Sequence, residues 1–247
     1  MRKAPLPRAA VNRPIGLLRP MEPIPQQEPV LVSWSGGKDS CMALREILGD
    51  PGLRVEALLT TITRDYDRVS MHGVRRALVE RQADSLGISL HQIPISNSAT
   101  NVEYETRMAE TFAIYREHGT NRVVFGDLFL EEIRAYRERL LTAQGMHGLY
   151  PVWGRDTLAL IREFIRQGFK TAVVCVDPKQ LDPSFLGRVI DEDFLSRLPT
   201  GVDPCGENGE FHTFVFDGPI FRYPIKLGFG EKVCRDSFWF CDLVPID

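Results

Sequence analysis

The stretch VLVSWSGGKDS, residues 30–40, decides the fold of this chain. Residues 30–34 form a short apolar run, which is typical of a buried strand. A helical pattern follows at 39–48, where Cys41, Leu44, Ile47 and Leu48 share one face. A strand that passes through a glycine turn into a helix is the opening unit of an α/β sheet.

The alternation of strand and helix continues to residue 150. It predicts strands at 55–62, 88–95 and 122–126, and helices at 74–86, 101–118 and 131–143. Parallel strands joined by such helices need right-handed crossovers, which cover both faces of the sheet. We therefore predict an α/β fold with a doubly wound parallel sheet.

The remainder of the chain divides into two parts of different character. Residues 1–29 hold seven of the seventeen prolines, which predicts an extended arm. Beyond residue 151 the pattern predicts helices at 156–167 and 191–198, and strands at 172–176, 211–216 and 237–244. We expect an arm at 1–29, a nucleotide-binding domain at 30–150 and a smaller α+β domain at 151–247.

Composition excludes several classes of protein. Of the 247 residues, 43% are hydrophobic and 26% are charged, which is ordinary for a globular chain. We find no apolar run of the roughly 18 residues needed to span a bilayer. The net charge of −3 disfavours nucleic acid as a partner. The five cysteines form no Cys-x-x-Cys pair, which favours reduced thiols and a cytoplasmic location.

Residues 35–40 predict a binding site for phosphate. Gly36 and Gly37 allow successive N–H groups to converge, and the following helix directs the positive end of its dipole there. Ser35 and Ser40 add hydroxyl donors, and Lys38 adds a positive charge unless it faces solvent. Asp39 caps the helix or holds a magnesium ion. The alternative is a plain glycine turn with a serine cap.

The sequence SGGKDS resembles the pyrophosphate loop (PP-loop) of N-type ATP pyrophosphatases. It matches neither Gly-x-x-x-x-Gly-Lys-Ser/Thr nor Gly-x-Gly-x-x-Gly. The resemblance implies an adenine nucleotide alpha hydrolase-like (HUP-like) fold with ATP and Mg²⁺ as cofactors. It also implies that the loop grips the β and γ phosphates as leaving pyrophosphate, while the α phosphorus is attacked to give an adenylate.

Three further segments narrow the resemblance. They are VFGD at 124–127, LYPVW at 149–153 and GENGEFHT at 206–213. With the loop they resemble the diphthine–ammonia ligase family over residues 30–221, which carries a Pro-Leu-Trp segment and Glu-Gly-Gly-Glu-Phe/Tyr-Glu-Thr. This chain departs from that pattern at Asn208 and His212, and Leu-Phe-Leu-Glu-Glu-Ile-Arg replaces a Ser-x-Tyr-Gln-Arg element. The Asn/His form resembles a bacterial sister group for which a role in cobalamin-precursor salvage has been proposed.

The segment at 206–213 supplies the second set of candidate catalytic residues. Glu207, Glu210 and His212 place three titratable groups within six residues. Such a cluster can orient an amine, remove its proton or coordinate magnesium. The alternative is a tight turn at Asn208-Gly209 flanked by surface carboxylates.

Four single residues are weaker candidates. Gly126 and Asp127 lie at the carboxyl end of a predicted strand, where α/β sheets bind ligands, so we assign them to ATP. His72 contacts adenine or ribose, or is an ordinary loop histidine. Cys205 as a nucleophile requires an activating base.

Together these features predict an AMP-forming ligase. We expect a small-molecule or protein-borne carboxylate to be adenylated and then amidated by ammonia or another amine, with Lys38 and Asp39 acting beside the 207–212 cluster. The alternatives are an ATP-binding sensor without turnover and an adenylase that modifies tRNA. A second copy of the chain is the remaining candidate partner.

Overall fold

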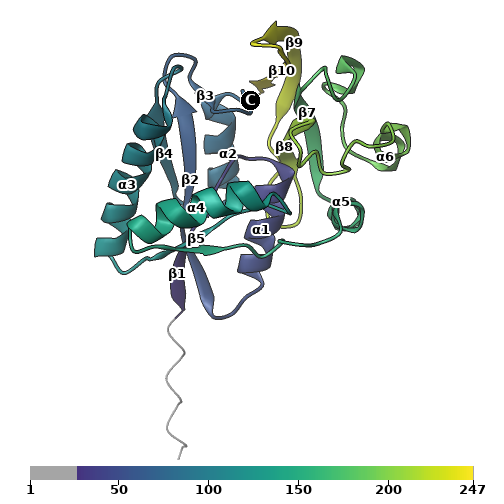
Figure 1. The fold of residues 1–247 in the computed structure, drawn as a ribbon. Coiled ribbons are helices and arrows are strands. Elements are labelled where there is room, and N and C mark those ends of the chain that lie inside the picture. The colour runs from purple at the N-terminus through teal and green to yellow at the C-terminus, as the bar shows by residue number, and fades with distance from the viewer. Residues whose placement is uncertain (1–26, 247) are drawn as a thin grey trace, which may run out of the picture.

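The computed structural model describes residues 27–246, so the predicted arm lies almost entirely outside the described residues (Figure 1). The first part contains β1 (Glu28–Ser33), α1 (Lys38–Leu48), β2 (Leu53–Thr63), β3 (Arg68–Val69), α2 (Arg76–Leu86), β4 (Leu90–Ile95), α3 (Asn101–Glu117), β5 (Arg122–Val124), α4 (Glu131–Ala143) and β6 (His147–Leu149). β1 starts earlier than expected, because Glu28 and Pro29 already pair with β2.

β1 is the central strand of the first sheet. It pairs in parallel with β2 on one side and with β5 on the other, and β4 and β6 extend the sheet outward, also in parallel. Only the short β3 is antiparallel, at the end of β2. The chain therefore changes direction across the sheet at β1, and the carboxyl ends of β1 and β5 lie at the switch point where α/β sheets bind ligands.

Helices cover both faces of this sheet, which confirms the doubly wound α/β prediction. Leu31 packs in the core beneath α3 and α4, together with Phe112 and Leu141. Its neighbours Val30 and Val32 point to the other face, into the core of α1, α2 and the second part of the chain. This alternation follows from the two-residue period of a strand.

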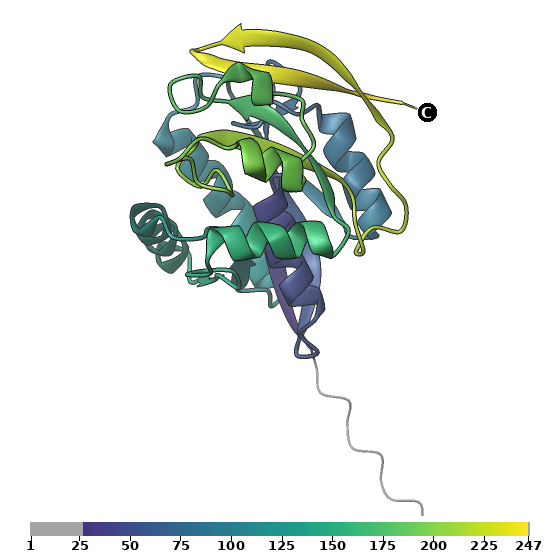
Figure 2. The ribbon, with the colours of Figure 1, turned by 90° about the vertical axis from the view of Figure 1, so that its right-hand side faces the viewer.

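The second part is a smaller α+β unit, as predicted. It contains α5 (Thr157–Arg166), β7 (Lys170–Val176), a 3₁₀ turn (Pro183–Phe185), α6 (Glu192–Arg197), β8 (Phe211–Asp217), β9 (Leu227–Arg235) and β10 (Phe238–Pro245). The strands form an antiparallel sheet in the order β8-β7-β10-β9. Figure 2 shows the β9–β10 hairpin at the far edge of the molecule, in yellow.

The two parts share one hydrophobic core. Phe211 and Phe214 of β8 belong to the same buried cluster as Val32 of β1 and Leu44 of α1. β8 therefore contacts α1, the helix that covers this face of the first sheet (Figure 1). Across residues 27–246, no helix combines the length and the apolar character needed to span a bilayer.

Candidate active site

The turn between β1 and α1 is held in shape by glycine and by side chains from α2 and β8. Gly36 has φ +77°, and a Cβ there would lie 2.7 Å from Gln82 Oε1. Gln82 Nε2 donates to the Gly36 carbonyl at 3.0 Å, and Val215 N–H donates to the same oxygen at 2.9 Å. Gly37 faces the Thr213 carbonyl, which a Cβ would approach to 3.0 Å. Close packing therefore favours glycine at both positions, and the positive φ is a second reason for glycine at Gly36.

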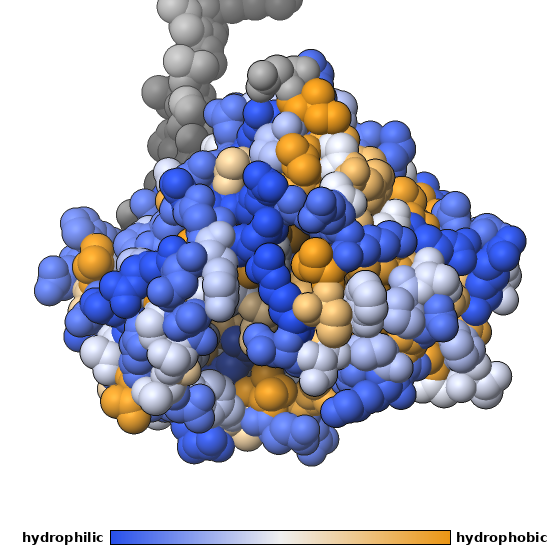
Figure 3. All heavy atoms as spheres, turned by 90° about the horizontal axis from the view of Figure 1, so that it is seen from above, coloured by the Kyte–Doolittle hydropathy of each residue, from blue (hydrophilic) through white to orange (hydrophobic). Residues whose placement is uncertain are grey.

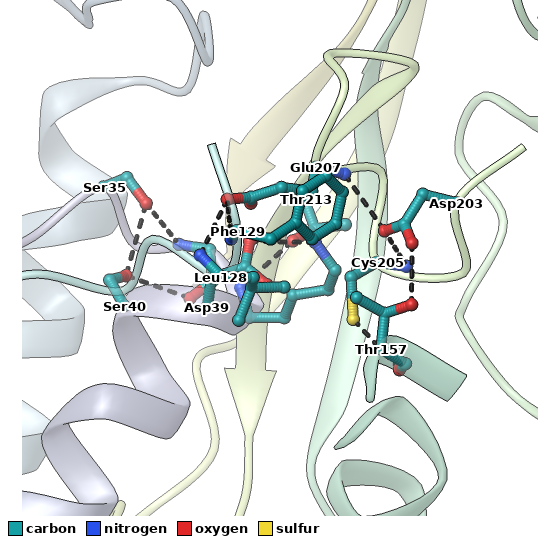
Figure 4. Close-up of polar contacts among 12 residues, drawn as sticks. Ser35, Asp39, Ser40, Leu128, Phe129, Thr157, Asp203, Cys205, Glu207 and Thr213 are labelled. Atoms are coloured by element: carbon teal, nitrogen blue, oxygen red, sulfur yellow. Dashed lines mark hydrogen bonds and ion pairs between the residues drawn. The ribbon is translucent and has the colours of Figure 1, made fainter. Parts of the chain in front are cut away.

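The first amides of α1 are bonded to side-chain oxygens. Gly37 N–H donates to Ser35 Oγ at 3.2 Å, and Lys38 N–H donates to Thr213 Oγ1 at 3.1 Å (Figure 4). Ser40 Oγ donates to the Gly37 carbonyl at 3.0 Å and lies 3.2 Å from Ser35 Oγ. Amides in the first turn of a helix have no partner within the helix. Phosphate oxygens can take the place of these hydroxyl acceptors at a helix N-terminus.

Lys38 points inward beside Asp39. Its side chain is 4% exposed, and Nζ lies 2.9 Å from Asp39 Oδ2 and 5.3 Å from the centre of the Phe211 ring. Burial lowers the pKa of Lys38, but Asp39, Cys205 and Glu207 together outweigh burial, so the pKa of Lys38 is raised. Lys38 is therefore a fixed positive charge in the site and does not face solvent.

Asp39 places a carboxylate beside residues 35–40, where magnesium was predicted, and the same carboxylate pairs with Lys38. The Asp39 side chain is 30% exposed, at the first turn of α1 next to the phosphate loop. Within residues 27–246 there is no group of three or more His, Cys, Asp or Glu side chains arranged to hold a metal. A magnesium ion here would take most of its ligands from phosphates and water, as magnesium usually does in nucleotide sites.

The β5–α4 loop lies directly against the phosphate loop. A Cβ on Gly126 would come within 2.6 Å of the Asp39 carbonyl carbon and 2.8 Å of the Ser40 nitrogen. Asp127 is engaged differently, because its carboxylate pairs with Arg137 of α4 at 2.8 Å. Of the two residues predicted at this strand end, Gly126 contacts the phosphate loop and Asp127 is committed to α4.

A second loop, residues 203–210, approaches from the C-terminal part and is organised by Asp203. Asp203 Oδ1 accepts the Cys205 and Glu207 amides at 2.9 and 3.2 Å, and Oδ2 accepts the Thr157 hydroxyl at 2.7 Å (Figure 4). Three bonds to one carboxylate fix this loop relative to α5.

Glu210 completes the same loop from inside. It is 2% exposed, and its Oε1 accepts the Asp203 amide at 2.9 Å and Asn208 Nδ2 at 3.0 Å. Among the described residues, its Oε2 has no hydrogen-bond partner. Glu210 therefore braces the 203–210 loop, while Gly209 with φ +85° closes the turn.

Glu207 joins the two parts of the chain at the site. Its Oε1 accepts the Leu128 amide at 2.7 Å and the Phe129 amide at 3.4 Å. Burial raises the pKa of Glu207 to about 7, against the lowering effect of the Leu128 N–H. The carboxyl group thus titrates near neutral pH, which is the range suited to proton transfer.

His72 and His212 meet although 140 residues separate them in the chain. Their ring centres are 4.6 Å apart. Burial lowers the pKa of His72 to about 4 and holds the pKa of His212 well below its usual range. Both imidazoles are therefore neutral at pH 7, and each has one ring nitrogen that can accept a hydrogen bond.

The segment that carries His72 is fastened to β10. Arg68 and Arg75 both pair with Asp242, at 2.8 and 2.6 Å. Gly73 packs so closely on Phe240 that a Cβ would lie 2.7 Å from its ring. These contacts set the position of His72 against β8.

Cys205 does not have the properties of a nucleophile. Its Sγ donates to the Thr157 carbonyl at 3.3 Å, and burial raises the pKa of the thiol. A protonated, hydrogen-bonded thiol is unreactive at neutral pH.

Three residues of the site did not emerge from the sequence as functional. Thr213 is the last residue of the GENGEFHT segment, so the motif could have identified it as a candidate. Gln82 and Asp203 carry no such signal, because their roles depend on contacts between distant elements.

Comparisons with known proteins identify the family of this chain. Residues 29–148 match the family model for the diphthamide synthase N-terminal domain, and residues 156–244 match the model for its C-terminal domain. Diphthine–ammonia ligase from Danio rerio is 27% identical over 82% of this chain and 88% of its own length. The enzyme of the same name from Mus musculus is 24% identical, with coverage of 82% and 84%. That from Schizosaccharomyces pombe is 28% identical over 87% of this chain and 38% of its own length. The chain therefore belongs to the diphthamide synthase family and is an ATP-dependent, amide-forming ligase.

Proposed function

We propose that the enzyme joins a carboxylate to ammonia through an acyl adenylate. A carboxylate oxygen attacks the α phosphorus of ATP, the bond to the bridging oxygen breaks, and pyrophosphate leaves. Ammonia then attacks the acyl carbon, AMP leaves with the bonding electrons, and the nitrogen gives up a proton. The products are an amide, AMP and pyrophosphate.

The observation that carries this proposal is the state of the α1 N-terminus. Two of its amides are bonded to the hydroxyl oxygens of Ser35 and Thr213, and a buried Lys38 stands beside them. An anion with several oxygens can replace both hydroxyls at once and gain the charge of Lys38. We assign the β and γ phosphates to residues 35–40, with Gly126 forming the wall toward the α phosphate.

The remaining catalytic roles follow from protonation states. His212 is neutral and next to His72, so it can accept a hydrogen bond from ammonia, whereas its lowered pKa makes it too weak a base to hold the proton that the nitrogen loses. Glu207 lies across from residues 35–40, and its carboxyl group exchanges a proton near neutral pH. We place Glu210 as the residue that keeps the 203–210 loop in position, and Asp39 as a ligand of Mg²⁺, which would neutralise phosphate charge when bound.

The relatives' name specifies the first substrate to test. These proteins are called diphthine–ammonia ligases, so we propose diphthine as the carboxylate and ammonia as the amine. His212 and Asn208 differ from the residues that the resemblance implies, so other carboxylates belong in the same screen. The five cysteines of the enzyme are all free, which is consistent with the cytoplasm as its place of action.

A product assay tests the proposal. The enzyme is incubated with ATP, Mg²⁺ and ammonium, with and without diphthine, and AMP, ADP, pyrophosphate and amide are measured. We expect one AMP, one pyrophosphate and one amide per turnover, all dependent on diphthine. Lys38→Met is expected to abolish turnover, whereas the exposed Lys170→Met is not. ADP, or ATP binding without turnover, or pyrophosphate release that requires tRNA, would contradict the proposal.

A further inference from the structure

An arginine at the start of α4 lies between two aromatic rings. The Arg134 guanidinium carbon is 4.5 Å from the centre of the Tyr150 ring and 4.6 Å from that of Trp153. The two rings stand at 72° to each other, with centres 6.0 Å apart. Contact with aromatic rings holds a guanidinium while leaving N–H groups at its edge for a planar oxyanion.

The charge of Arg134 is not balanced within the described part of the chain. No carboxylate between residues 27 and 246 lies within ion-pair distance of it, whereas Arg137 on the same helix is paired with Asp127. The nearby Glu138 is turned toward Tyr150, and burial together with that carboxylate raises the pKa of the tyrosine. Arg134 therefore has aromatic contacts but no anionic partner.

Backbone contacts connect this arginine to the phosphate loop. The Leu128 amide is bonded to Glu207, and the Leu128 carbonyl accepts the Gly154 amide at 2.8 Å, next to Trp153. Gly126, two residues before Leu128, lies against the first turn of α1. Figure 3 views the molecule from above, toward the carboxyl ends of the parallel strands, and shows this face hollowed near its middle.

We propose that Arg134, flanked by Tyr150 and Trp153, binds the carboxylate of the acyl substrate. This inference rests on the proposed function and adds the residue that selects and positions the acid. The phosphate loop has its own amides and Lys38 for the nucleotide, so we assign the oxyanion at Arg134 to the acid and not to the nucleotide. A guanidinium edge matches a carboxylate with two parallel hydrogen bonds.

Binding measured without turnover tests the inference. Calorimetric titrations with free diphthine and, separately, with the ATP analogue α,β-methylene-ATP compare wild type with Arg134→Ala and Arg134→Lys. We expect Arg134→Ala to lower the affinity for diphthine at least tenfold and to change the affinity for the ATP analogue less than twofold. Arg134→Lys keeps the charge but loses the planar guanidinium with its paired N–H donors, so its affinity for diphthine should lie between those of wild type and Arg134→Ala. Arg139→Ala is the matched control, because Arg139 lies over the ring of Tyr136 on the same helix and has no ion pair within residues 27–246. Thermal unfolding checks that each variant is folded.

The outcomes separate this inference from the proposed function. Diphthine binding that depends on Arg134 without any pyrophosphate release would support the inference and refute the proposed function. An equal loss of affinity for diphthine and for the ATP analogue would assign the arginine to the nucleotide and overturn the inference. So would unchanged diphthine binding in Arg134→Ala, or a wild type that binds no diphthine. If turnover occurs, Arg134→Ala should raise the KM for diphthine at least tenfold and leave the KM for ATP unchanged.

Discussion

Replacing Gly126 by alanine perturbs the contact on which the site is built. The added Cβ would lie 2.6–2.8 Å from the backbone of Asp39 and Ser40, whereas ordinary contacts start near 3.4 Å. The β5–α4 loop and the N-terminus of α1 must therefore separate by about 0.6–0.8 Å. Backbone atoms cannot rotate away as a side chain can, so the separation moves the phosphate loop.

The expected cost has two parts. Overpacking of this kind destabilises a protein by about 1–3 kcal/mol. For a chain of this size that lowers the Tm by about 2–12 °C. A displaced α1 terminus also loses at least one hydrogen bond to a charged phosphate, about 1.5–3 kcal/mol. This corresponds to about 10- to 150-fold weaker ATP binding.

Scanning calorimetry and titration with ATP measure the two parts separately. Gly49→Ala is the matched control at the other end of α1, where φ is −82° and the nearest contacts are 3.4 and 3.7 Å. It should leave the affinity for ATP unchanged. If Gly126→Ala bound ATP like wild type and melted at the same temperature, the close approach of these segments would not define the site.

Four other variants, at three residues, test the local chemistry. Since the pKa of Glu207 is raised from 4.5 to about 7, wild type should lose stability as pH rises from about 4.5 to about 7, by at most about 3 kcal/mol before solvent screening reduces it. Glu207→Gln should remove that slope in urea melts, and an unchanged slope would assign the titration elsewhere. Thr213→Val leaves the buried Lys38 amide unpaired and should cost about 1–3 kcal/mol, whereas Thr213→Ser should recover most of the loss, and equal melting of the two would refute the bond. Cys205→Ala should retain turnover, and iodoacetamide should label the exposed Cys234 first in native protein; loss of turnover at unchanged stability would restore the nucleophile hypothesis.

Much of the first domain could be predicted from local pattern. Helix α4 matches its predicted bounds, 131–143, and Gly87 ends α2 in the left-handed conformation. These elements are encoded by apolar periodicity and by glycine after the helix. The two-residue period of a strand places Val30 and Val32 on one face of the sheet.

The missed strands lack such a pattern. β3 and β6 have two and three residues, too few for a period to appear. β9 lies at the edge of its sheet, is largely exposed and contains Gly228 and Gly230, so it has no apolar alternation. It exists because β10 offers it backbone partners.

The site was predictable in composition and less so in geometry. Residue types and motifs selected Lys38, Glu207 and His212, which the fold does bring to one region. Neither the inward position of Lys38 nor the contact between His72 and His212 could be derived from spacing. Both depend on how the second sheet packs against the first, which is decided by long-range contacts.

The most direct test is a structure of the enzyme with α,β-methylene-ATP and Mg²⁺. We expect the β and γ phosphates to lie against residues 35–40, with the Gly37 and Lys38 amides transferred from Ser35 and Thr213 to phosphate oxygens. The α phosphorus should face the space between Gly126 and Glu207. Phosphates bound elsewhere, with these two amides still on their hydroxyl partners, would contradict the account.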